Sequence, residues 1–184
     1  MNLGYKALVL LGAMSQAGDD LADFHVKMEE LDTRAIDHEE VIRLYEERSD
    51  MKNRYRVIET MDGSAPRAIR GRMVYRAGID FKSPRETNYQ YSPYLLEALL
   101  QMVNFHIIMR DQAEQRSVIP LRIGQMLFWR RCLVGEEVII EARMREQDDE
   151  GITWDARAVA KDGEVIMTVK NISMGWFYKR GPFE

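Results

Sequence analysis

One side chain capable of proton transfer and one that could orient it by a hydrogen bond lie four residues apart in the apolar stretch SPYLLEALLQMVNFHI, residues 92–107. They are Glu97, a carboxylic acid, and Gln101, a carboxamide. Because an α-helix turns by about 100° per residue, Gln101 lies about 40° from Glu97, and Asn104 lies about 20° away on the other side. The three side chains would therefore form one narrow polar line on a helix that is otherwise apolar.

This polar line has two interpretations. It could be the solvent edge of the helix, or it could face a cleft, where a buried carboxylate is costly unless it is partnered or protonated. Desolvation raises the pKa of a carboxyl group, so a carboxyl group in a cleft becomes a proton donor near neutral pH. In the cleft interpretation Glu97 is the proton donor, and Gln101 orients it or binds a substrate.

Capping residues predict where two helices begin. Ser92 is a good N-cap and Pro93 suits the first helical position, which predicts a helix that ends near Arg110. Asp37 could cap a second helix over residues 38–50. The apolar stripe of that second helix is formed by Val41, Leu44 and Tyr45.

Most of the remaining sequence has the pattern of β-strands. The predicted strands cover residues 55–61, 68–78, 121–131, 136–147, 152–161 and 164–178. A turn is predicted at 62–66 (DGSAP), and residues 3–14 are predicted to be a strand or a short buried segment. Apolar residues alternate with charged ones over residues 138–145, which predicts one buried and one wetter face of the sheet.

A helix that is apolar nearly all round must be enclosed, and a curved antiparallel meander wrapped around it would satisfy both elements. This predicts the hotdog fold of the α+β class, with a long central helix wrapped by a curved antiparallel sheet. We predict an N-terminal strand and helical extension over residues 1–50 and the hotdog domain over residues 51–180. Because a single hotdog sheet has a free edge, we expect a homodimer or pairing with a second hotdog.

Composition and charge exclude several classes of protein. The net charge is −4 and no basic stripe is present, so no nucleic-acid partner is expected. No apolar run approaches the ~20 residues that a membrane helix needs, so no membrane association is expected. The single Cys132 favours a reducing, cytoplasmic compartment, although residues 6–17 also outline a short signal peptide. No cluster of Cys and His has metal-ligand spacing, so no metal is predicted.

Three arginines lie in the predicted strand at 121–131. Arg122, Arg130 and Arg131 either belong to an exposed strand face or attract a phosphate-bearing arm or an acidic partner protein. Cys132 follows them directly and is interpreted as a structural thiol.

The segment LLEALLQ (95–101) resembles the helix motif of hotdog-fold 3-hydroxyacyl-ACP dehydratases, in which Glu or Asp is followed four residues later by Gln or His. The resemblance is strongest to the second, C-terminal hotdog of polyketide synthase dehydratase domains and covers roughly residues 36–178. The helical segment HEEVIRLYEERSD, then AIRGRMVYRA, YSPYLLEALLQ, IPLRIGQMLFWR and GEEVIIEARM follow in the order expected for that family.

The resemblance implies an activity and a set of roles. The activity is loss of water from a 3-hydroxyacyl thioester, in polyketide or fatty acid biosynthesis, with no cofactor beyond the phosphopantetheine of an acyl carrier protein or coenzyme A that carries the substrate. Glu97 would protonate the leaving hydroxyl group, and Gln101 would support it. Substrate binding would involve Asn104 and the helix N-terminus near Tyr94 and Leu95, whose amides would polarise the thioester carbonyl.

The sequence departs from this family at the second catalytic group, a histidine that removes the C2 proton. Ser83 stands at the spacing where stand-alone dehydratases have that histidine, and none of the three histidines has the family's context. His25 and His38 are predicted to be surface residues, and His106, opposite Glu97, a packed core residue. Three hypotheses stay open: a dehydratase whose histidine lies on a partner, a thioesterase that uses the carboxylate to activate water, and a non-catalytic subunit that binds acyl chains or a carrier protein.

Overall fold

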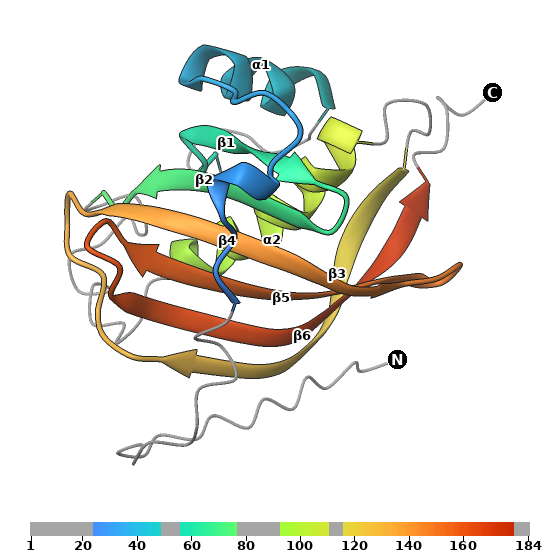
Figure 1. The fold of residues 1–184 in the computed structure, drawn as a ribbon. Coiled ribbons are helices and arrows are strands. Elements are labelled where there is room, and N and C mark those ends of the chain that lie inside the picture. Colours follow the sequence, from blue (N-terminus) through green and yellow to red (C-terminus); the bar gives the residue numbers. More distant parts are fainter. Residues whose placement is uncertain (1–23, 49–55, 77–92, 111–115, 179–184) are drawn as a thin grey trace, which may run out of the picture.

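A computed structural model describes residues 24–48, 56–76, 93–110 and 116–178 (Figure 1). Its helices are η2 (Met28–Glu30), α1 (His38–Arg48) and α2 (Pro93–Arg110). Its strands are β1 (Thr60–Ala65), β2 (Ala68–Val74), β3 (Arg116–Phe128), β4 (Glu137–Gln147), β5 (Gly151–Ala160) and β6 (Val165–Tyr178). The strand predicted at 3–14 and the N-cap predicted at Ser92 lie outside the described residues.

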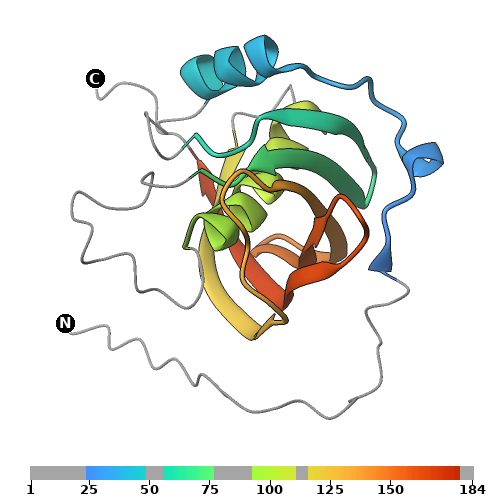
Figure 2. The same ribbon diagram turned by 90° about the vertical axis from the view of Figure 1, so that its left-hand side faces the viewer.

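The strands form one antiparallel sheet in the order β1-β2-β4-β5-β6-β3. The sheet curves around α2, as the end-on view shows (Figure 2), which confirms the predicted α+β hotdog fold. The expectation of a simple meander was wrong for β3, which pairs with β6 at the far edge. The reason is that α2 is 18 residues long, and a helix of that length carries the chain across the width of the sheet before β3 begins.

Helix α2 is buried on nearly every side, as its sequence predicts. Its fully buried residues Leu99, Met102 and Val103 belong to the same core as the inward-facing residues of β2, β4, β5 and β6. Gly71 of β2 allows this close packing, because a Cβ atom there would lie 2.8 Å from the Thr60 carbonyl oxygen and 3.2 Å from the Met102 methyl carbon. The central helix is therefore held close to the sheet and cannot shift without repacking the core.

The first hairpin differs from the prediction. Strand β1 begins at Thr60 and continues through the sequence DGSA, so the turn consists of Pro66 and Arg67. The register shifts between Met61 and Gly63, where Gly63 has a φ of 140°. Because of this irregularity, β1 can contain a sequence that is typical of turns and still pair with β2 up to Ala65.

Helix α1 confirms the predicted cap and stripe. The Glu40 amide N–H donates to the Asp37 carboxylate at 3.0 Å, and Val41 and Tyr45 are buried. Tyr45 contacts Phe105 of α2 edge to face, with ring centroids 5.0 Å apart. Helix α1 therefore packs on the same core as α2, while the predicted domain boundary at residues 50 and 51 lies outside the described residues.

The outer face of the sheet is partly covered by residues 24–36, which run along it as a strap (Figure 2). Val26 of this strap is fully buried against Ala65 and Ala68. Beneath the strap Glu141 is only 1% exposed and accepts a 2.5 Å hydrogen bond from Arg157 Nε. The expectation that Glu141 lies on a wetter face was therefore wrong, because a chain segment distant in sequence covers it.

Candidate active site

The polar line of α2 is not an open solvent edge. Gln101 is 2% exposed, and Glu97 and Asn104 are half-buried. Helix α1 covers the line at Gln101, and the start of β3 lies at Asn104, whose Oδ1 accepts a 3.5 Å bond from the Val118 amide. The structure therefore brings Glu97 and Gln101 together in a partly enclosed environment.

A chain of hydrogen bonds runs from the backbone to the Glu97 carboxyl group. The Ile58 amide N–H donates to the Tyr45 hydroxyl oxygen at 3.1 Å, and the Tyr45 hydroxyl donates to Gln101 Oε1 at 2.5 Å. Gln101 Nε2 then donates to Glu97 Oε1 at 2.7 Å. The sequence identified Tyr45 only as part of an apolar stripe, because the position of its hydroxyl group depends on how α1 packs against α2.

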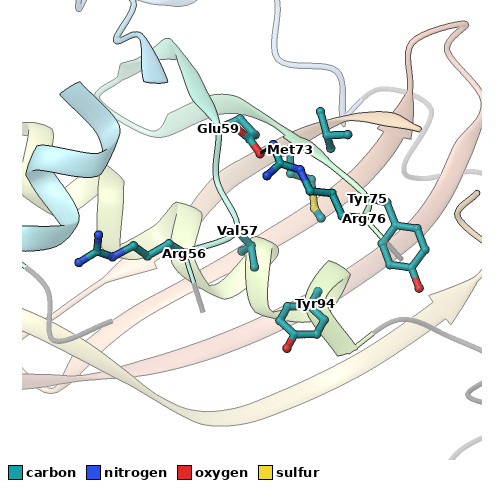
Figure 3. Close-up of a pocket in the computed structure, with 8 residues that line it drawn as sticks. Arg56, Val57, Glu59, Met73, Tyr75, Arg76 and Tyr94 are labelled. Atoms are coloured by element: carbon teal, nitrogen blue, oxygen red, sulfur yellow. Dashed lines mark ion pairs between the residues drawn. The ribbon is translucent and has the colours of Figure 1, made fainter. Parts of the chain in front are cut away.

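A pocket with about 320 Å³ of space, including its solvent-open mouth, lies at the N-terminal end of α2. Its lining residues are Arg56, Val57, Glu59, Met73, Val74, Tyr75, Arg76 and Tyr94. Figure 3 shows Tyr94 on one side and Glu59 and Arg76, which form a 2.5 Å ion pair, on the other. Tyr94 precedes Glu97 by three residues, so the pocket begins about one helical turn from the carboxyl group.

The predicted substrate-binding residues are distributed between different environments. Tyr94 is buried and lines the pocket, whereas the Leu95 side chain belongs to the hydrophobic core. Asn104 is directed to the β3 backbone. Glu97 is not among the residues that line the pocket, so the roles predicted for these side chains stay predictions.

All three histidines have partners other than Glu97. His106 is 5% exposed, donates from Nε2 to the Ala65 carbonyl at 2.9 Å, and meets the Trp154 ring edge to face with centroids 4.8 Å apart. The exposed His25 and His38 lie 3.0 Å from the carboxylates of Glu141 and Glu59, respectively. These placements agree with the predicted core and surface positions.

Burial lowers the pKa of His106 from 6.5 to about 4, which predicts acid destabilisation. The neutral imidazole contributes stability above pH 6.5. This contribution is lost as the pH falls from 6.5 to about 4, because in this range the unfolded state binds a proton more readily than the folded state does. The loss is about 3 kcal/mol. Urea denaturation at pH 7 and pH 4 should show a smaller pH dependence for His106→Gln than for the wild type, and equal dependence would contradict the assignment.

Three further features of the described residues concern the Cys132 thiol, metal ions and membranes. Burial raises the pKa of the Cys132 thiol to about 12, with a further contribution from Glu136, so the thiol stays protonated near neutral pH. In the ranges given above, no three side chains of His, Cys, Asp or Glu gather in a way that could hold a metal ion. None of the helices in those ranges combines the length and apolar character that a membrane crossing requires.

A family model described as the polyketide synthase dehydratase N-terminal domain matches residues 27–181, which is most of the chain. The chain belongs to the polyketide synthase dehydratase family. This confirms the resemblance inferred from the motif on α2. Because the matching model describes the N-terminal domain, the closer likeness to the second hotdog stays a prediction.

Solved structures of polyketide synthase dehydratases share the fold. The dehydratase domain from the CurJ module of the curacin polyketide synthase is 14% identical, with a TM-score of 0.65 over 90% of this chain and 55% of that chain. An inactive mutant of the CurK dehydratase is 18% identical, with a TM-score of 0.64 over 91% and 55%. The chain thus spans about half the length of these dehydratases.

The same fold is found outside the dehydratase family. Zebrafish thioesterase superfamily member 2 is 12% identical to this chain, with a TM-score of 0.56 over 77% of this chain and 98% of that chain. At this identity the likeness is one of fold alone. A comparison with curated protein sequences gives no match.

Proposed function

We propose that this chain is one hotdog of a dehydratase that removes water from 3-hydroxyacyl thioesters in polyketide or fatty acid biosynthesis. The observation that carries the proposal is the half-buried Glu97, which accepts a hydrogen bond from the buried Gln101 on the central helix of a dehydratase-family fold. The substrate would be carried on the phosphopantetheine of an acyl carrier protein or coenzyme A, without a further cofactor.

In the proposed reaction a base removes the proton from C2, and the C3–O bond breaks as the C2=C3 double bond forms. Glu97 gives its proton to the departing hydroxyl group, which leaves as water, and Gln101 holds the carboxyl group in place. The pocket at Tyr94 would receive the acyl or pantetheine portion of the substrate. The backbone amides in the first turn of α2, near Tyr94 and Leu95, would polarise the thioester carbonyl, and Asn104 would contribute to substrate binding from further along the polar line.

The base is proposed to be an imidazole of a partner, because the three histidines of the chain are engaged elsewhere. The partner that supplies this imidazole would be a separate hotdog, since in a second copy of the chain the same three histidines would be engaged in the same way. Strand β3 supports this proposal, since it is an edge strand whose Ile119 and Leu121 are 47% and 62% exposed. Pairing at this edge would cover both side chains and extend the sheet.

A carrier protein would dock through arginines whose charge is not offset by a carboxylate among the described residues. Arg130 is held by Glu136 and Glu164, at 2.5 and 2.6 Å, so its charge is largely offset. Arg122 and Arg131 are exposed and are the better candidates for an acidic partner. A cytoplasmic location is part of this proposal and is supported by the single, protonated Cys132.

The test is to incubate the purified chain, alone and together with a dehydratase hotdog that carries a catalytic histidine, with 3-hydroxyacyl pantetheine thioesters and to follow loss of water by mass spectrometry. We expect the enoyl thioester as product when the second hotdog is present, and a sedimenting species larger than the monomer in the same sample. Release of free thiol instead would identify a thioesterase and overturn the proposal.

The second candidate function is a non-catalytic acyl- or carrier-binding subunit, favoured by the observation that each histidine has another partner. It predicts measurable binding of the thioester or of acyl carrier protein without turnover. Binding without turnover would replace the dehydratase proposal if it persisted with the second hotdog present.

A further inference from the structure

We propose that Tyr45 is a positioning residue, which orients the carboxamide of Gln101 so that Nε2 faces Glu97. As a consequence, Oε2 is the oxygen of Glu97 that carries the transferred proton. The orientation stands on hydrogen-bond geometry alone. Its catalytic consequence rests on the proposed function.

The direction of the hydrogen-bond chain is determined at its backbone end. The Ile58 amide can only donate, so the Tyr45 oxygen accepts from it at 3.1 Å. The single hydroxyl hydrogen of Tyr45 is then directed at Gln101, 2.5 Å away, and the atom that receives it must be the carbonyl oxygen Oε1. Burial also raises the pKa of the Tyr45 hydroxyl group, so that this donor keeps its hydrogen.

The same direction is transmitted to the carboxyl group. With Oε1 turned to Tyr45, Gln101 presents the donor Nε2 to Glu97 Oε1 at 2.7 Å. In a protonated carboxylic acid the carbonyl oxygen is the stronger acceptor, so Oε1, which accepts this bond, is favoured as the carbonyl oxygen and the hydrogen resides on Oε2. A flipped carboxamide would place Gln101 Oε1 against a carboxylate oxygen, and two acceptors would repel each other.

The surroundings of Tyr45 make the arrangement rigid. Its ring is buried and meets Phe105 edge to face, at an interplanar angle of 82°. Gln101 is buried as well, so water does not readily replace the hydroxyl group as donor. Tyr45→Phe would keep this ring contact and remove only the hydroxyl group.

The first measurement uses the wild-type protein with its glutamine side-chain amides labelled with ¹⁵N. The Gln101 resonance is identified by its absence from Gln101→Glu. We expect nuclear Overhauser effects from its amide protons to the side-chain methylene protons of Glu97, and slow exchange of one amide proton with solvent. Contacts from these amide protons to the Tyr45 ring alone would show the opposite orientation and overturn the proposal.

The second measurement compares Tyr45→Phe with a matched control, Thr168→Val. The control removes a different, partly buried hydrogen bond, in which the buried Thr168 Oγ1 accepts from Trp129 Nε1 at 3.3 Å, away from α2. In Tyr45→Phe we expect amide exchange at Gln101 to accelerate about tenfold, and kcat to fall about tenfold with KM unchanged. Thr168→Val should lower Tm and change neither quantity.

The two arms separate this proposal from the proposed function. If the wild type has no turnover even with the second hotdog present, the dehydratase proposal fails, while the amide measurements still decide the orientation. Unchanged amide exchange in Tyr45→Phe would overturn the positioning role, whether or not kcat falls.

Discussion

Replacing Glu97 by glutamine is expected to lower turnover of 3-hydroxyacyl thioesters by about 10²–10⁴-fold. Glutamine has nearly the shape of glutamate and can still accept the bond from Gln101 Nε2, but it cannot give a proton to the leaving hydroxyl group. The loss should therefore appear in kcat, with substrate binding retained. Steady-state kinetics with the enoyl product followed by absorbance would measure it.

The matched control for this prediction is Glu146→Gln, which makes the same substitution at an exposed position on β4. Both variants should unfold at nearly the wild-type urea midpoint, because Glu97 is only half-buried and Glu146 is exposed. A Glu97→Gln protein with the wild-type rate would refute the proton-donor role. Equal losses in both variants would point to a general effect of charge.

Replacing Arg157 by methionine is expected to lower the free energy of unfolding by about 3 kcal/mol or more. Arg157 Nε donates to Glu141 at 2.5 Å beneath the strap, where both side chains are buried. Without the guanidinium, Glu141 keeps a nearby imidazole nitrogen of His25 at 3.0 Å and Arg70 Nε at 3.9 Å, which compensate the carboxylate only in part. Urea denaturation at pH 7 would measure the loss.

Two comparisons make this prediction specific to a buried ion pair. The double variant Arg157→Met with Glu141→Leu should recover much of the stability, because neither member of the pair then leaves a buried charge behind. Arg34→Met, which breaks a 2.5 Å pair with Glu40 on the surface, should have little measurable effect. A double variant no more stable than Arg157→Met alone would contradict the explanation.

The sequence by itself determined the central helix, the hotdog class and the alignment of Glu97 with Gln101. These features depend on periodicity along one segment, since residues four apart lie on the same face of any α-helix. The same local reasoning located the Asp37 cap and the strands β4, β5 and β6 to within a few residues. Local pattern also separated the core position of His106 from the surface positions of His25 and His38.

Tertiary structure alone decided the contacts between segments that are far apart in the chain. Tyr45 bonds to Gln101 across 56 residues, and the strap reaches Glu141 from more than a hundred residues away. No pattern in either segment encodes these pairings, because they arise from how α1 packs on α2 and how the strap crosses the sheet. The position of β3 at the sheet edge is likewise a matter of tertiary packing. The chain crosses the sheet along α2 before β3 begins, and β3 then pairs with β6 at the edge of the sheet.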